Sequence, residues 1–126
     1  MSAPPHVLYV DDSAPMCELT QLLLEEAGYR VTCAADADAA LHALAAPGSQ
    51  VAAVVADFQM PRCDGPALAR RVARAAPGVP VVLTSTCVDE ERARMARDAG
   101  AVGLVEKSAN GSGLLQALAG IVQLPG

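Results

Sequence analysis

Short apolar runs alternate along the chain with longer segments of mixed polarity. We predict five strands from these runs, at His6–Val10, Tyr29–Cys33, Val51–Asp57, Val79–Ser85 and Val102–Glu106. The third run is rich in β-branched valine and has the length of a strand that is buried on both faces, as in parallel sheets. It ends abruptly in a carboxylate, followed by Met-Pro and Asp-Gly pairs that predict a loop.

The segments between the runs have helical spacing and helix-end signals. Ser13, with Pro15 in the first turn, predicts the start of one helix, and Gly28 predicts its end. Asp36 predicts the start of the second helix, Pro66 opens the third, and 89–99 is the fourth. The expected buried stripes are Met16, Leu19, Leu23 and Ala27 in the first helix and Leu114, Leu118, Ile121 and Val122 in the last.

Strands that alternate with helices through short connections predict an α/β fold with a parallel sheet covered on both faces. Right-handed crossovers leave few topologies, of which the flavodoxin-like doubly wound order 2-1-3-4-5 is expected at this size. With 126 residues, the chain is expected to be a single domain over residues 1–126.

Composition narrows the class of partner. The net charge is −5, without a cluster of Lys or Arg, which argues against binding to nucleic acid or to an anionic membrane surface. The four cysteines lack zinc-site spacing and predict reduced thiols in the cytoplasm. The start has no secretory signal pattern, and no apolar run approaches the roughly 20 residues of a membrane span.

Polar side chains follow four of the five predicted strands. Asp11 and Asp12 follow the first strand, Asp57 ends the third, Thr84-Ser85 ends the fourth and Lys107 follows the fifth. Parallel strands have their carboxyl ends at one edge, so these groups should converge there. Carboxylates about 4 Å apart repel by roughly 4 kcal/mol at an effective dielectric near 20, which predicts a cation. Oxygen ligands without His or Cys favour Mg²⁺.

Taken singly, each of these residues would be read as a solvated loop group, and it is their joint placement that favours a phosphoryl or metal site. The segments D-D-S, D-F-Q-M-P-R-C-D-G, P-V-V-L-T-S-T and A-G-A-V-G-L-V-E-K occur in this order along the chain. In order and spacing they resemble the receiver domains of two-component response regulators, of which the single-domain chemotaxis regulator is the familiar example. The resemblance covers essentially the whole chain.

The resemblance implies a role for each of these residues. Asp57 would be the phosphoacceptor, attacking a phosphohistidine to form an acyl phosphate. Asp12 and Asp57 would bind Mg²⁺ directly with the backbone carbonyl of Gln59, and Asp11 would act mainly through water. Lys107 would neutralise charge on the transferred group. Ser85, counted from Pro80, would be the hydroxyl that switches.

The same resemblance implies partners rather than a metabolic substrate. The donor would be a histidine kinase or a histidine phosphotransfer protein. A downstream target would bind the face formed by the predicted helix 89–99, the strand at 102–106 and the last helix, and the resemblance allows a homodimer on activation. The chain would not be an enzyme, apart from removing its own phosphoryl group.

The sequence departs from the family at several positions near the expected site. Ser108 stands where the family usually has proline after a cis peptide bond, which predicts a strained or differently shaped loop. Leu104 replaces an aromatic residue that often reports switching. Gln59 and Cys87 flank the expected phosphoryl group, and neither is a good base for an attacking water. These two residues predict a phosphorylated state that is not short-lived.

Two other functions are compatible with these residues. One is a degenerate receiver that keeps the fold as an interaction surface without phosphorylation, which Ser108 and Leu104 favour. The other is a small Mg²⁺-dependent phosphohydrolase with an aspartate nucleophile. Such enzymes commonly have a second acid two residues after the nucleophile, where this chain has Gln59.

Overall fold

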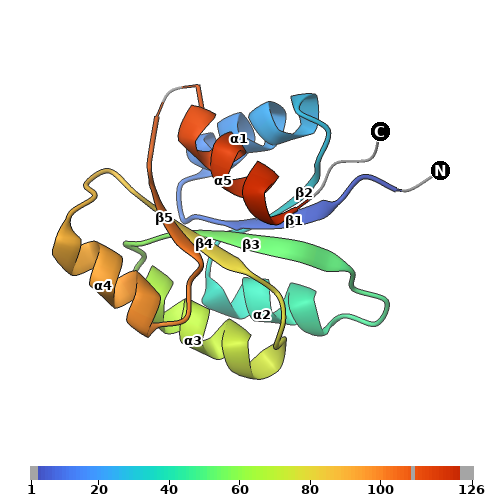
Figure 1. Ribbon diagram of the computed structural model, residues 1–126. Coiled ribbons are helices and arrows are strands. Elements are labelled where there is room, and N and C mark those ends of the chain that lie inside the picture. The colour runs from blue at the N-terminus through green and yellow to red at the C-terminus, as the bar shows by residue number, and fades with distance from the viewer. Residues whose placement is uncertain (1–2, 109, 123–126) are drawn as a thin grey trace.

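A computed structural model describes residues 3–108 and 110–122 of the chain. Strands and helices alternate throughout the described part (Figure 1). The strands are β1 (His6–Val10), β2 (Arg30–Ala34), β3 (Val51–Asp57), β4 (Val81–Ser85) and β5 (Gly103–Glu106), and the helices are α1 (Ala14–Glu26), α2 (Ala37–Ala45), α3 (Gly65–Ala75), α4 (Glu90–Asp98) and α5 (Ser112–Ile121).

All strands pair in parallel in the order β2-β1-β3-β4-β5, which confirms the predicted doubly wound α/β fold. Helices α1 and α5 cover one face of the sheet, and α2, α3 and α4 cover the other (Figure 1). None of the described helices has the length and apolar character needed to cross a membrane.

Two separate apolar cores hold the helices on the sheet. The core beneath α2, α3 and α4 includes Leu8, Val54, Leu68 and Leu83, all with no exposed surface. The core beneath α1 and α5 is built around Tyr9, with Val55, Leu24 and Leu118. Because successive strand residues point to opposite faces, alternate residues of β1 and β3 supply the two cores. These central strands are therefore fixed from both sides.

The helix starts follow the predicted capping residues. The side chain of Ser13 accepts a hydrogen bond from the backbone N–H of Met16, and Asp36 accepts one from Ala39. Asp64 and Asp89 cap α3 and α4 in the same way. Each cap satisfies an N–H group that has no partner within its helix.

Two predicted core stripes are partly wrong. In α1, Leu19 is 40% exposed, and the positions that are buried are Thr20 and Leu24. The buried positions are each one residue further along than predicted, and Thr20, whose hydroxyl an apolar pattern does not anticipate in the core, lies beside the buried Tyr9. In the last helix Ile121 is 38% exposed. The backbone becomes extended at Val122, which is buried as predicted.

Three strands start one or two residues later than predicted, at Arg30, Val81 and Gly103, while β1 and β3 start as predicted. Strand β4 begins at Val81 rather than Val79, because Pro80 has no N–H to donate to a neighbouring strand. The carbonyl of Pro80 still accepts a hydrogen bond from the N–H of Val54 at 2.9 Å. Strand ends agree more closely, and it is the ends that carry the polar residues considered next.

Candidate functional site

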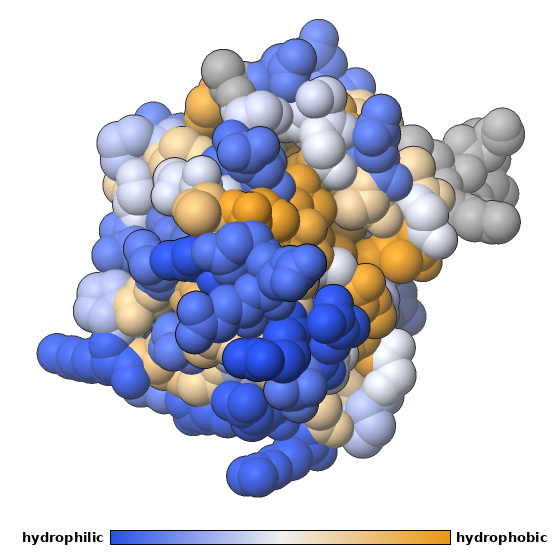
Figure 2. All heavy atoms as spheres, turned by 60° about the vertical axis from the view of Figure 1, so that its left-hand side comes forward, coloured by the Kyte–Doolittle hydropathy of each residue, from blue (hydrophilic) through white to orange (hydrophobic). Residues whose placement is uncertain are grey.

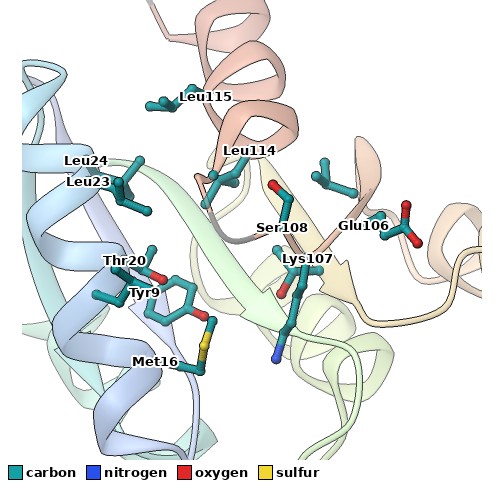
Figure 3. A pocket seen from close by; sticks show the side chains of 14 residues that line it. Tyr9, Met16, Thr20, Leu23, Leu24, Glu106, Lys107, Ser108, Leu114 and Leu115 are labelled. Atoms are coloured by element: carbon teal, nitrogen blue, oxygen red, sulfur yellow. The ribbon is translucent and has the colours of Figure 1, made fainter.

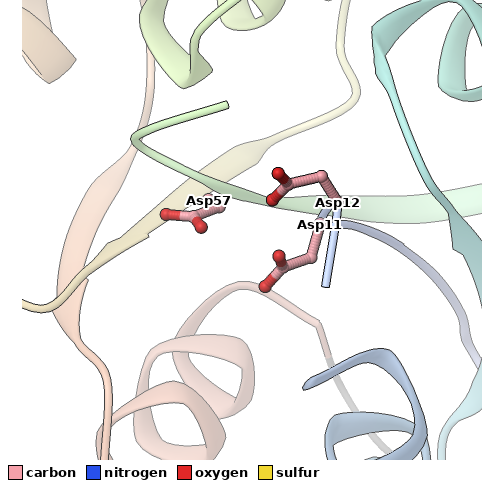
Figure 4. A group of neighbouring side chains, drawn as sticks. All are labelled: Asp11, Asp12 and Asp57. Carbon is pink, nitrogen blue, oxygen red and sulfur yellow. The ribbon is translucent and has the colours of Figure 1, made fainter. Parts of the chain in front are cut away.

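Three aspartates meet at the edge of the sheet where the strands end. Asp11 and Asp12 follow β1 and Asp57 is the last residue of β3, and since these strands are neighbours their ends lie side by side. One carboxylate oxygen from each residue lies within 4.8 Å of the others (Figure 4). Asp11 is 1% exposed, Asp57 is partly buried, and Asp12 is exposed to solvent. The cluster is thus open to solvent on the side of Asp12.

Lys107, which follows β5, brings a positive charge to this cluster. Its Nζ donates a hydrogen bond to Oδ2 of Asp57 at 2.9 Å and lies 3.5 Å from Oδ2 of Asp11. Burial acts to lower the pKa of Lys107, but the hydrogen bond to Asp57 and the charges of Asp11 and Asp57 outweigh it and raise the pKa. The side chain is therefore an ammonium ion at neutral pH.

Asp11 is held by donors on both of its oxygens. The backbone N–H of Ser13 donates to Oδ1 at 3.0 Å, and the phenol of Tyr9 donates to Oδ2 at 2.8 Å. Tyr9 is buried, and burial together with the hydrogen bond to Asp11 raises the pKa of the phenol far above its usual range. The phenol therefore stays protonated and acts as a permanent donor.

The loop after β3 is folded tightly back on the end of that strand. The N–H of Gln59 donates to Oδ1 of Asp57 at 3.2 Å, and the N–H of Gly65 donates to the carbonyl of Phe58 at 2.9 Å. A Cβ at Gly65 would lie 2.7 Å from the carbonyl oxygen of Asp57, so only glycine permits this approach. The loop thereby fixes the backbone that carries Asp57.

The two hydroxyl residues at the end of β4 point to different surroundings. Ser85 is buried, and its Oγ accepts a hydrogen bond from the N–H of Cys87 at 3.2 Å. Thr84 lines a pocket between α1 and α5 that Tyr9, Thr20 and Lys107 also line (Figure 3). Within the described part of the chain, Oγ1 of Thr84 is the one buried side-chain oxygen or nitrogen without a hydrogen-bond partner.

The loop after Lys107 has no cis peptide bond, as is true of all the described residues. The lysine nevertheless reaches Asp57, because the N–H of Lys107 donates to the carbonyl of Ser85 at 2.8 Å. This hydrogen bond continues the β4–β5 pairing by one residue beyond the strand. With Ser108 in place of the family's usual proline, the side chain of Lys107 therefore still lies within the site.

The donor set suits a small, hard cation. The three aspartates supply oxygen atoms only, and Cys63 and Cys87 are absent from the cluster of candidate ligands found among the described residues. With Lys107 included, the formal charge of these four side chains is −2, which a divalent ion balances. Mg²⁺ prefers such carboxylate oxygens and keeps several waters. The three aspartates therefore form a donor set that fits a hydrated divalent cation such as Mg²⁺.

Sequence reasoning placed the three aspartates and Lys107 at this edge but missed Tyr9, Thr20 and Arg92. Tyr9 lies two residues before Asp11, and this spacing puts both side chains on the same face of the strand, which is a signal that the sequence does contain. Arg92 of α4 packs its guanidinium 6.0 Å from the ring centre of Phe58 and 2.7 Å from Asp89. No local pattern predicts that long-range contact.

Comparisons with known proteins agree with this geometry. The family model "Response regulator receiver domain" matches residues 7–119. The chain is 36% identical over 107 residues to the "Transcriptional regulatory protein FixJ" of Bradyrhizobium diazoefficiens, covering 85% of this chain and 51% of that protein. It is 32% identical over 123 residues to the "Transcriptional regulatory protein CseB" of Streptomyces avermitilis, covering 98% of this chain and 51% of that protein. The chain thus spans about half the length of these curated relatives.

A solved structure gives the same picture. The chemotaxis protein CheY4 of Vibrio cholerae superposes with a TM-score of 0.86 at 27% sequence identity. The alignment covers 95% of this chain and 100% of that one. A receiver domain protein from Clostridium thermocellum, with a TM-score of 0.85 at 22% identity, shares the fold.

Proposed function

The chain belongs to the response regulator receiver domain family, and we propose that it accepts a phosphoryl group onto Asp57 from a histidine kinase or a histidine phosphotransfer protein. The observation that carries this proposal is the hydrogen bond of 2.9 Å between Lys107 and Asp57 inside a cluster of three carboxylates. Receiver domains are signalling domains that take phosphoryl groups from histidine kinases. The proposal extends that general function to named residues of this chain.

Asp57 is the proposed nucleophile. Its carboxylate is partly exposed, so an incoming phosphohistidine can reach it, while the N–H of Gln59 and the ammonium of Lys107 each hold one of its oxygens. In the transfer, a carboxylate oxygen of Asp57 forms a bond to phosphorus as the phosphorus–nitrogen bond to histidine breaks. Lys107 then pairs with a phosphoryl oxygen, since a point charge can follow the group that it neutralises.

We assign the metal ligands to Asp12, Asp57 and the backbone carbonyl of Gln59, with Asp11 contributing through water. When bound, Mg²⁺ supplies positive charge beside the transferred phosphoryl oxygens. The exposure of Asp12 supports this assignment because a partly hydrated ion can approach from that side. Asp11, with both oxygens already engaged, is better suited to hold a water than to bind the metal directly.

Ser85 is the proposed switch hydroxyl. It is buried at the end of β4, and its present hydrogen bond, from the N–H of Cys87 at 3.2 Å, lies within its own loop. Movement of Ser85 toward a phosphoryl group on Asp57 would break that hydrogen bond and shift the loop that leads into α4. The interaction between Arg92 and Phe58 would be disturbed by the same shift.

The proposed output face consists of α4, β5 and α5. Apolar side chains on α4 and in the loops that flank it reach solvent, with Val88 44%, Met95 38% and Val102 56% exposed. Figure 2 brings the left-hand side of Figure 1 forward and shows apolar surface among predominantly hydrophilic side chains. We propose that a target protein, or a second copy of the chain after activation, binds there. We also propose that the protein is located in the cytoplasm.

The phosphorylated form should be slow to hydrolyse. Gln59 is exposed and Cys87 is exposed, so water can reach both sides of the proposed acyl phosphate. Neither side chain is a general base at neutral pH that could activate that water. Equal dephosphorylation rates in the wild type and in variants at both positions would contradict this part of the proposal.

The test is incubation of the chain with Mg²⁺ and a small phosphoryl donor, followed by mass measurement. We expect one added phosphoryl group, which hydroxylamine removes as it removes other acyl phosphates. Asp57→Asn should gain none, while the matched variant Asp38→Asn, on an exposed acid outside the cluster, should behave like the wild type. Phosphorylation of Asp57→Asn, or none in the wild type, would refute the proposal.

The same experiment separates the two alternative functions. A chain that binds partners but takes up no phosphoryl group with Mg²⁺ would be a phosphorylation-independent receiver. Repeated release of phosphate from an ester substrate would indicate a phosphohydrolase. The half-buried position of Leu104 on β5, in place of an aromatic side chain, is the feature that still favours the first alternative.

A further inference from the structure

Tyr9 places a neutral hydrogen-bond donor at the most buried acid of the site. The side chain is 1% exposed, and its phenol donates to Oδ2 of Asp11 at 2.8 Å. The phenol lies in the core between the sheet and α1, with Thr20 of α1 beside it (Figure 3). Nothing in the proposed transfer of a phosphoryl group to Asp57 requires a tyrosine at this position.

The same carboxylate oxygen is also within reach of a charged donor. Nζ of Lys107 lies 3.5 Å from Oδ2 of Asp11 and 2.9 Å from Oδ2 of Asp57. The ammonium is thus closer to Asp57, although Asp11 is the more deeply buried carboxylate. A buried charge without a partner is strongly unfavourable, so Asp11 would draw Lys107 closer if no other donor were present.

We propose that Tyr9 is a positioning residue for cation binding, which occupies Oδ2 of Asp11 and thereby keeps Lys107 at Asp57. This inference rests on the proposed function, since it takes the three aspartates as the Mg²⁺ site. A neutral donor satisfies the buried oxygen without neutralising its charge. The carboxylate cluster therefore keeps its negative potential for the cation, and Lys107 stays where the phosphoryl group arrives.

Loss of the phenol hydroxyl should let the ammonium settle between Asp11 and Asp57. Mg²⁺ would then have to displace a more tightly held positive charge before it could bind. Groups that hydrogen-bond to the acids of a metal site commonly change metal affinity by about 10- to 100-fold when removed. For Tyr9→Phe, which keeps the ring and removes only the hydroxyl, we expect the Mg²⁺ dissociation constant to rise about 10-fold.

The test is calorimetric titration of the full chain with Mg²⁺ alone. The matched control is Tyr29→Phe, because Tyr29 is also buried but lies just before the start of β2, whereas the aspartates follow the ends of β1 and β3. We expect wild-type affinity in Tyr29→Phe and weaker binding in Tyr9→Phe. Wild-type affinity in Tyr9→Phe would overturn the inference while leaving the metal site intact.

Measuring the effect of Tyr9→Phe in the Lys107→Met variant distinguishes a positioning role of Tyr9 from a general loss of structure. In Lys107→Met no ammonium can compete with the cation, so adding Tyr9→Phe to it should change Mg²⁺ affinity little. This coupling between the two sites is what a double-mutant cycle measures. An equal loss of affinity in both backgrounds would show that Tyr9 acts only through folding, which would overturn the inference.

A spectroscopic readout avoids altering Tyr9. The chain has two tyrosines and no tryptophan, so Tyr29→Phe leaves Tyr9 as its single tyrosine. Mg²⁺ binding should shift the near-ultraviolet absorption of Tyr9, because the cation changes the charge at the acceptor of its hydrogen bond. Binding without a spectral change would overturn the inference, even if Tyr9→Phe failed to fold. An absence of Mg²⁺ binding in the wild type would instead refute the proposed metal site.

Discussion

Replacement of Asp12 by asparagine should make the chain more stable in the absence of metal and insensitive to Mg²⁺. The three carboxylates lie within 4.8 Å of one another, and at an effective dielectric near 20 each pair at that distance repels by about 3.5 kcal/mol. Asp12 takes part in two of these three pairs. Because it is exposed, water screens most of this repulsion, and measured interactions of exposed charges are about 0.2 to 1 kcal/mol.

We therefore expect Asp12→Asn to raise the free energy of unfolding by about 1 kcal/mol. For a chain of this size that corresponds to a rise of roughly 3 to 5 °C in the unfolding temperature. The asparagine side chain is nearly isosteric with aspartate, so packing changes little. Lys107 keeps both of its acidic partners, Asp11 and Asp57, in the variant.

The assay is thermal unfolding followed by far-ultraviolet circular dichroism, in chelator and in Mg²⁺. A ligand at 100 times its dissociation constant stabilises a folded protein by about 2.7 kcal/mol, so wild type should gain stability with Mg²⁺. Asp12→Asn should gain almost none, because it lacks a proposed ligand. The curves of the two proteins should therefore cross as the Mg²⁺ concentration rises.

Glu18→Gln is the matched control, since it removes one exposed negative charge from α1 and leaves the cluster unchanged. It should respond to Mg²⁺ as the wild type does. A less stable Asp12→Asn in chelator would show that some other interaction of Asp12 outweighs the repulsion within the cluster. An unchanged response of Asp12→Asn to Mg²⁺ would show that the cation binds elsewhere.

Two further predictions concern stability. Gly65→Ala should lower the free energy of unfolding by about 2 kcal/mol or more, because the new Cβ would lie 2.7 Å from the backbone oxygen of Asp57. The control Gly120→Ala, whose new Cβ would have nothing within 4 Å, should be neutral or stabilising. Urea unfolding measures both changes. Burial and the charge of Arg30 lower the pKa of His6 below 6.5, so the folded chain favours the neutral imidazole. The stability that the neutral His6 contributes is therefore present above pH 6.5 and is lost as the pH falls through the lowered pKa. Urea unfolding at pH 8 and pH 5.5 should therefore show a smaller acid loss in His6→Asn, and an equal loss would contradict the prediction.

The sequence was sufficient to predict the order of the strands and the edge of the sheet at which the polar residues meet. Both follow from one regularity, since strands buried on two faces are uninterrupted apolar runs, and the first polar residue after each run marks the same edge. Asp57 at the end of β3 and Lys107 after β5 are fixed in this way. Capping was equally local, because Ser13 and Asp36 bond to N–H groups within three residues of themselves.

The sequence was not sufficient where polar groups pair inside the core. Apolar spacing assigned Leu19 to the buried face of α1, and the structure buries Thr20 instead, beside the phenol of Tyr9. A hydroxyl is compatible with a buried position only if a second polar group faces it, and that second group lies on another element. The pattern of apolar and polar residues within one segment cannot predict a pair whose two members lie on different elements.

The acidic cluster and its single lysine also explain why the site is built on the most constrained strands. Three carboxylates against one ammonium leave a net negative charge that works against folding, and the proposed Mg²⁺ would offset it. Such a conflict between local chemistry and stability is expected at functional sites, where the rest of the fold must offset it. Here β1 and β3 are packed from both faces and the loop at Gly65 closes on β3. In the proposed Mg²⁺ site, the repulsion would therefore be kept as affinity for the cation rather than relieved by movement of the strands.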